Sequence, residues 1–168
     1  MRYVHLAMLL LFSLLQVSTT AKDAKPSVGT SPGSLSPELR VVDREGVEHS
    51  LKDFSGKRVL VNFWAAYDGL SRERNIRFSR MLNQDEYSDV VYLSVSLDPS
   101  FSVFEETVSL DGLNSEQQFT CQPGQQGVLM KQFKLAKGRH SFLINEEGVI
   151  AAINLSPEEA AQLLLEVV

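Results

Sequence analysis

Residues 56–71 read GKRVLVNFWAAYDGLS, and this stretch decides the fold. Residues 58–65 form a strongly apolar run that is rich in β-branched and aromatic side chains, which predicts a buried strand. The polarity changes at Asp68, where we expect a helix that continues to about Gln84. An aspartate at a helix start accepts a backbone N–H and complements the positive end of the helix dipole. Asp68 is therefore predicted to be the N-cap of this helix.

The chain on both sides of this strand and helix extends the pattern to an α/β domain. The predicted elements are a hairpin over 39–43 and 48–51, a strand over 90–97, a short helix over 100–110, a weak strand over 117–121, a helix over 126–133, strands over 140–144 and 149–154, and a last helix capped by Ser156. A β-α-β crossover followed by a helix, a hairpin and a final helix predicts a mixed sheet flanked by helices.

The first residues have the three-part layout of a secretory signal peptide. Arg2 supplies positive charge, residues 6–17 are almost wholly apolar, and Ala21 follows two threonines at a cleavage position. This run is shorter than the ~20 residues that span a bilayer, so we expect no membrane span after cleavage. The predicted organisation is a signal peptide over 1–21, a flexible linker poor in large apolar side chains over 22–37, and one domain over 38–168.

Charge and cysteine content exclude several classes of protein. The chain has 16 basic and 21 acidic residues and no basic block, which argues against a nucleic-acid partner. Its single cysteine, Cys121, cannot form an intramolecular disulfide. No cluster of cysteine and histidine has the spacing of metal ligands, so we expect neither a bound metal nor a cofactor.

Three segments carry a resemblance to a known family: residues 56–65 (GKRVLVNFWA), 95–98 (VSLD) and 141–150 (SFLINEEGVI). They resemble the exported thioredoxins of the TlpA and ResA type, within the wider thioredoxin and peroxiredoxin-like superfamily. The resemblance implies a thioredoxin-like fold with a central mixed sheet, an N-terminal β-hairpin and an insertion near residues 99–120. With the signal peptide, it also implies the periplasm of a Gram-negative bacterium.

The chemistry of that family rests on a Cys-x-x-Cys motif, in which one thiolate attacks and the second resolves the mixed disulfide. In this chain Trp64 to Tyr67 is followed by Asp68 and Ser71 at the two thiol positions, and neither side chain can form a mixed disulfide. The family's cis-proline corresponds by position to Arg139, where we expect a trans peptide because a non-proline cis bond costs ~3 kcal/mol. We therefore expect no dithiol exchange.

The resemblance brings the cis-proline loop opposite the start of the first long helix. Tyr67, Asp68, Arg139 and His140 are then expected to converge in a polar groove next to Trp64. Trp64 is expected in the core, and Tyr67 is expected to be exposed. Asp68 has an alternative role as an ion-pair partner of Arg139.

Other polar side chains near this groove have two interpretations each. Ser71 is either a second capping group or a solvated side chain. The arginines at 72, 74, 77 and 80 are expected to form a solvated helix face, with Glu73 paired to Arg77, and a basic docking patch is the alternative. Cys121 is expected to be a small apolar core residue, and an exposed thiol that forms an intermolecular disulfide is the alternative.

The functional hypothesis is an exported thioredoxin-like protein that lacks the redox dithiol. We expect it to serve as a binding or scaffolding module of the cell envelope, with an envelope protein or a peptide segment as its partner. The alternative is a single-thiol redox or antioxidant role through Cys121 in redox homeostasis.

Overall fold

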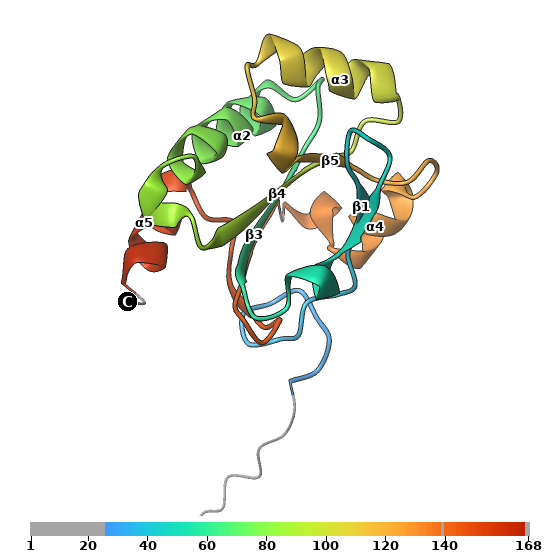
Figure 1. Cartoon of the computed structure of the whole chain (residues 1–168). Helices are drawn as coiled ribbons and strands as arrows, with labels where there is room; N and C mark the ends of the chain where they lie inside the picture. Colours follow the sequence, from blue (N-terminus) through green and yellow to red (C-terminus); the bar gives the residue numbers. More distant parts are fainter. Residues whose placement is uncertain (1–25, 139, 167–168) are drawn as a thin grey trace, which may run out of the picture.

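The computed structural model describes residues 26–138 and 140–166, and these residues contain one mixed β-sheet (Figure 1). The strands are β1 (Arg40–Val42), β2 (Glu48–Ser50), β3 (Arg58–Trp64), β4 (Val90–Ser96), β5 (Gln118–Thr120), β6 (Ser141–Ile144) and β7 (Ile150–Ile153). The helices are α2 (Gly69–Leu82), α3 (Phe101–Leu110), α4 (Gln126–Gln132) and α5 (Pro157–Leu165). Short 3-10 turns are η1 (Leu51–Phe54), η2 (Asp85–Tyr87), η3 (Ser115–Gln117) and η4 (Leu135–Lys137).

The strand order is β2-β1-β5-β4-β3-β6-β7, with β3 and β4 in the centre. β3 and β4 are parallel, β4 and β5 are parallel, and β6 pairs with β3 in the antiparallel sense. The predicted insertion near 99–120 forms α3 and β5, which add a parallel strand next to β4. The sequence therefore predicts the elements and the mixed sheet correctly.

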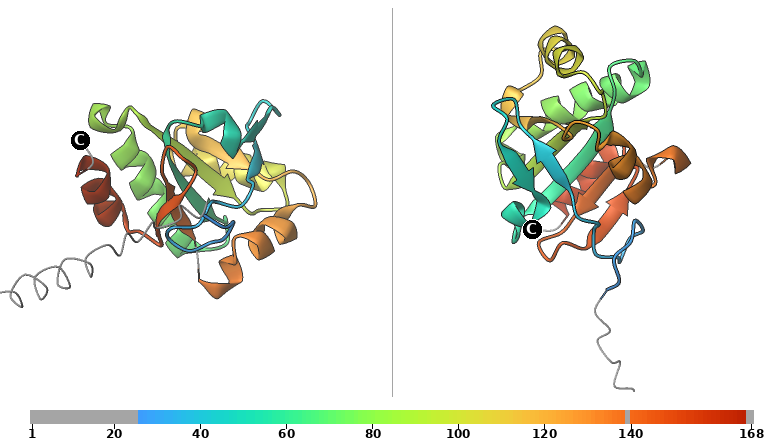
Figure 2. Two further views of the ribbon diagram at one scale, coloured as in Figure 1. Left: turned by 90° about the horizontal axis from the view of Figure 1, so that it is seen from below. Right: turned by 90° about the vertical axis from the view of Figure 1, so that its right-hand side faces the viewer.

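The sheet is covered on both faces, as Figures 1 and 2 show. α2 and α5 lie on one face, and α4 lies on the other. Neighbouring side chains of a strand point to opposite faces, so one strand serves both layers. Leu60 of β3 packs with Phe78 of α2, whereas Val59, Val61 and Phe63 pack on the α4 side.

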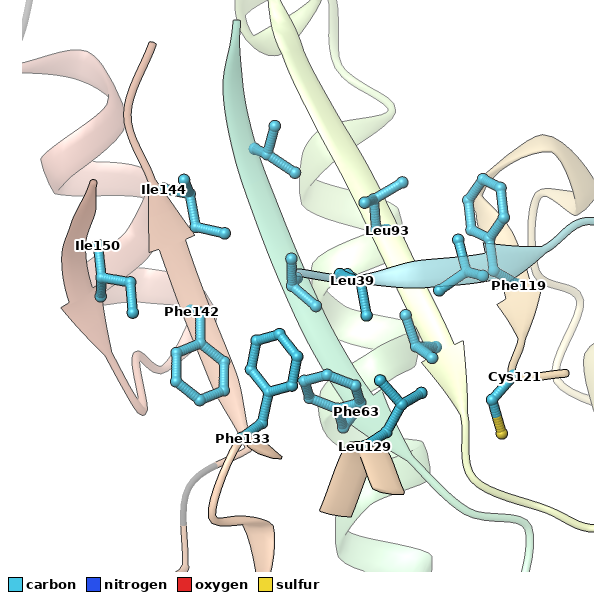
Figure 3. Packing of buried hydrophobic residues seen from close by; sticks show 14 residues of the cluster. Leu39, Phe63, Leu93, Phe119, Cys121, Leu129, Phe133, Phe142, Ile144 and Ile150 are labelled. Carbon is cyan, nitrogen blue, oxygen red and sulfur yellow. The ribbon is translucent and has the colours of Figure 1, made fainter. Parts of the chain in front are cut away.

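The core on the α4 face is built around aromatic rings (Figure 3). The ring of Phe133 lies with its centroid 5.1 Å from that of Phe63 and 5.3 Å from that of Phe142. All three phenylalanines are at most 2% exposed. Burying such side chains stabilises the fold by roughly 1.5–3 kcal/mol each, so this cluster fixes β3 and the residues that follow it.

A buried polar network lies between α2 and the centre of the sheet. Asn75 of α2 accepts hydrogen bonds at Oδ1 from the Tyr92 hydroxyl and the Ser94 hydroxyl, each at 2.6 Å. Its Nδ2 donates to Gln118 Oε1 at 3.3 Å, and Asn62 Nδ2 donates to its Oδ1 at 3.4 Å. Asn75 is completely buried, so its position between the helix and three strands is fixed by these bonds.

The described part of the predicted flexible linker, residues 26–37, is bonded to the β6–β7 hairpin. Gly33 N–H donates to Ile150 O, Ile150 N–H donates to Ser34 O, and Ser36 N–H donates to Gly148 O, each at 2.9 Å. We therefore correct the prediction for this part of the chain. The prediction counted only large apolar side chains, whereas backbone hydrogen bonds hold this segment.

Two further predictions concern residues that the structure does not describe, and a third is tested only in part. The predicted signal peptide, residues 1–21, lies outside the described residues, and so does Arg139. Within residues 26–138 and 140–166, no helix has the length and hydrophobicity to cross a membrane.

Candidate functional site

The site is a loop, residues 65–68, that joins the end of β3 to the start of α2. Asp98 follows β4 and is only 4% exposed. Its Oδ2 accepts hydrogen bonds from Ala66 N–H and from the Ser96 hydroxyl, each at 2.8 Å. Sequence reasoning missed this role of Asp98. The sequence did hold a signal for it. β3 and β4 are parallel, so Asp98 after β4 and the loop after β3 lie at the same edge of the sheet.

Asp68 is the N-cap of α2, as the sequence predicts. Its backbone is extended, with φ −106° and ψ 98°. Its Oδ1 accepts hydrogen bonds from Leu70 N–H at 3.2 Å and from Ser71 N–H at 3.4 Å. The side chain at the first thiol position of the family therefore serves the helix end.

Asp68→Ala is expected to lower the free energy of unfolding by ~1 kcal/mol, because it leaves two helix N–H groups without this acceptor. Asp68→Asn is expected to change the free energy of unfolding by less than about 0.5 kcal/mol, because asparagine caps a helix about as well as aspartate. Urea unfolding of both variants measures the difference. A coupling above ~0.5 kcal/mol in a double-mutant cycle with Arg139→Ala would instead support the ion-pair alternative.

Ser71, at the second thiol position, is 3% exposed and is not solvated. Its hydroxyl donates to Asp68 O at 2.9 Å and accepts from Ala65 N–H at 3.2 Å. Of the two interpretations of Ser71, the solvated one is wrong, because the hydroxyl ties the start of α2 to the end of β3. With both of its hydrogen-bonding roles engaged by the backbone, this serine is poorly placed to act as a nucleophile.

Two cavities that share Arg74 and His140 in their linings form a groove beside the start of α2, which we call the α2 groove. The smaller, about 160 Å³, is lined by Tyr67, Asp68, Ser71, Arg74, Met130 and His140, among others. The larger, about 340 Å³, is lined by Leu70, Glu73, Arg74, Arg77, His140 and Asn154, among others. The structure therefore brings Tyr67, Asp68 and His140 together as the resemblance implied.

The aromatic residues at the end of β3 and in the loop differ in exposure, as the sequence predicts. Trp64 is 1% exposed, and its ring lies 6.2 Å from that of Phe104 of α3. Tyr67 is 82% exposed, and Leu70 in the first turn of α2 is 76% exposed. Trp64 thus belongs to the core, whereas Tyr67 and Leu70 present apolar surface at the rim of the groove.

His140 is held at the wall of the α2 groove by its backbone and by its ring. Its N–H donates to Asn154 Oδ1 at 2.9 Å, and its Nδ1 lies 3.2 Å from Gly138 O. Burial lowers the pKa of His140, and the positive charge of Arg74 lowers it further. Since a carbonyl oxygen can only accept, the neutral ring carries its proton on Nδ1 and leaves Nε2 as an acceptor.

The arginines of α2 do not form one solvated face. Arg72 pairs with Asp111 in the loop after α3, with Nε 3.0 Å from Oδ2, and Arg77 pairs with Glu158 of α5. The predicted pair between Glu73 and Arg77 is therefore wrong, because tertiary neighbours supply carboxylates that the helix alone does not show. Arg74 is half-buried and donates from Nε to Asn62 Oδ1 at 3.3 Å.

Cys121 follows β5 and lies at the edge of the core on the α4 face (Figure 3). It is 3% exposed, and its Sγ lies 3.8 Å from Ser96 O. Burial raises the pKa of the Cys121 thiol, and the nearby Asp98 carboxylate adds to this rise. These observations confirm a buried core residue, and the low thiolate content argues against a reactive thiol.

The described residues contain no group of three His, Cys, Asp or Glu side chains that could hold a metal ion. Comparison with known proteins then identifies the family of the chain. Residues 32–153 match the AhpC/TSA family. The chain belongs to the AhpC/TSA family.

Solved structures resemble this AhpC/TSA-family chain over most of its length. A thioredoxin-like protein from Parabacteroides distasonis is 36% identical with a TM-score of 0.70, and the match covers 84% of this chain and 99% of that one. The thioredoxin domain of a thiol-disulfide oxidoreductase from Bacteroides vulgatus is 23% identical with a TM-score of 0.72, covering 82% and 98%. These matches confirm the thioredoxin-like fold.

A curated relative, the thioredoxin-like protein YneN of Bacillus subtilis, is 24% identical over 132 residues, or 79% of this chain and 76% of the relative. The AhpC/TSA-family chain described here has a single cysteine, which lies at neither thiol position of the loop. It thus combines the fold of thiol-disulfide oxidoreductases with a β3–α2 junction in which Asp68 and Ser71 bond to the backbone.

Proposed function

We propose that this protein is a non-catalytic binding module of the cell envelope that holds an extended protein segment in the α2 groove. The observation that carries the proposal is the contrast between the two parts of the site. The thiol positions are occupied by side chains that bond to the backbone, whereas Tyr67 and Leu70 remain 82% and 76% exposed at the rim. The loop thus retains an accessible contact surface without a nucleophile.

Exposed aromatic and aliphatic side chains beside a groove are typical anchors of protein contacts. Tyrosine is enriched among the residues that dominate binding energy, because it combines a large apolar ring with a polar end. Tyr67 lines the smaller cavity and Leu70 the larger one, so a segment along the groove would contact both. The signal-peptide layout of residues 1–21 supports export, and an envelope protein is the corresponding partner class.

A single-thiol redox function would require substrates to reach Cys121. That thiol is 3% exposed. It follows β5, whereas the loop that carries Asp68 follows β3, and β4 lies between these two strands in the sheet. Cys121 lines a separate cavity of about 390 Å³ together with Asp98 and Phe101, but burial raises the pKa of its thiol, so little thiolate is available there.

The proposal predicts that Tyr67→Ala combined with Leu70→Ala weakens capture of envelope proteins by at least about tenfold, as expected when two anchor residues are removed. The measurement is a quantitative pull-down from envelope extracts with the purified protein as bait. Leu110→Ala is the matched control, because Leu110 is 73% exposed on α3 and does not line the groove. Equal capture of the same proteins by all three baits would contradict binding at the α2 groove.

A further inference from the structure

Arg74 lies where the two cavities of the α2 groove meet, because it lines both of them. Its Nε donates to Asn62 Oδ1 at 3.3 Å. Within residues 26–138 and 140–166, no carboxylate oxygen lies within 4.0 Å of its guanidinium, although Arg72 and Arg77 of the same helix are both paired. Arg80 also lacks such a partner, but it is exposed to solvent.

A half-buried guanidinium without a counter-ion loses hydration and gains little in return. Burial accordingly lowers the pKa of Arg74, although an arginine remains charged near neutral pH. The negative charge of Asp68 opposes this shift by raising the pKa of Arg74, but the Asp68 carboxylate already caps α2. The free N–H groups of Arg74 can therefore donate to an anion that enters the groove.

The other charges of the groove select the kind of anion. Asp68, Glu73 and Glu159 line it, and Glu159 already accepts a hydrogen bond from Ser156 N–H at 2.8 Å. Arg77 also lines the larger cavity, but its charge is paired with Glu158 of α5. Three acidic side chains disfavour a doubly charged phosphate by like-charge repulsion more than they disfavour a singly charged carboxylate. A carboxylate also matches the planar fork of a guanidinium.

His140 adds the complementary group. Its Nδ1 faces Gly138 O, so the Nε2 atom of the neutral ring is a hydrogen-bond acceptor. An extended peptide carries N–H donors along its backbone, whereas a free small acid does not. Arg74 as donor and His140 as acceptor, both lining the same two cavities, therefore fit a carboxylate that belongs to a peptide.

We propose that Arg74 binds a carboxylate of the protein segment held in the α2 groove. The inference rests on the proposed function, which it deepens by specifying an acidic segment. The carboxylate belongs either to an acidic side chain or to a C-terminus, and these two sources share the same chemistry at Arg74.

Three peptides of one length separate these sources. The first is acetyl-Ala-Val-Glu-Val-Ala-amide, the second replaces its glutamate with glutamine, and the third is the glutamine peptide with a free C-terminal carboxylate. Binding is followed by NMR, through the backbone signals of Tyr67 and Leu70 and the side-chain Nε–H signal of Arg74. One or both of the carboxylate peptides should bind about fivefold or more tightly than the amidated glutamine peptide, and should shift the Arg74 signal.

Two variants with the same charge change serve as test and control. In Arg74→Gln the preference for carboxylate peptides should disappear, whereas in Arg80→Gln it should remain. Equal binding of all three peptides to the wild-type groove would overturn the role of Arg74 and leave the proposed function standing. If no peptide shifts Tyr67 or Leu70 but sodium acetate shifts the Arg74 signal in wild type, the carboxylate site stands and segment binding fails. No shift at Arg74 with any of these probes would overturn the inference.

Discussion

A thiol reagent is expected to label Cys121 about a thousandfold or more slowly in the native protein than in urea, because a local opening that costs about 4 kcal/mol must come first. The thiol is 3% exposed, and burial raises its pKa, so both access and thiolate content limit the native rate. Stopped labelling followed by mass spectrometry measures both rates.

The control is an exposed thiol in the same protein. Ser109→Cys in a Cys121→Ser background places a thiol on the exposed side of α3, where labelling should be fast in both states. Rapid native labelling of Cys121, or a reducible dimer on a non-reducing gel, would favour the single-thiol hypothesis over a buried core residue.

Asn75→Ala is expected to lower the free energy of unfolding by about 3 kcal/mol, because it removes a shared acceptor from a completely buried network. The hydroxyls of Tyr92 and Ser94 both donate to Asn75 Oδ1 at 2.6 Å, and Gln118 loses its donor from α2. Chemical unfolding monitored by circular dichroism gives the measurement.

Two comparisons show whether the network or the helix is responsible. Tyr92→Phe removes one hydrogen bond of the network and is expected to cost about 1 kcal/mol. Asn83→Ala, at the exposed C-terminal end of α2, removes hydrogen bonds with Gln117 and Asn114 and should cost less than ~1 kcal/mol. A loss in Asn75→Ala no larger than that in Asn83→Ala would show that the buried network contributes little.

The elements were predictable because their signals are local. The apolar runs at β3 and β4 each fill one buried strand, and Ser156 with Glu159 forms the capping box that starts α5. Asp68 was predictable for the same reason, since a helix cap depends on residues within one turn.

The interior of the site depends on contacts between distant residues, which local patterns do not show. Asn75 lies among the four arginines of α2, so the sequence predicted a solvated helix face, yet Asn75 faces the sheet. A signal was present in the strands. Asn62 and Ser94 are polar residues inside apolar runs, and they lie side by side in the β3–β4 register, which indicates a polar partner above them.

Residues 26–37 are attached to the β6–β7 hairpin, and this attachment determines at which end, or pole, of the domain the protein can be linked to a surface or to another protein. Ile144 pairs with Val59 near the start of β3, whereas His140 O accepts from Phe63 N–H near its end. β3 has 7 residues. At ~3.3 Å per residue the two poles therefore lie roughly 20 Å apart. Residues 26–37 lie at the pole away from the β3–α2 loop (Figure 1), so a sensor surface or fused protein joined upstream of residue 26 leaves Tyr67 accessible to the solution.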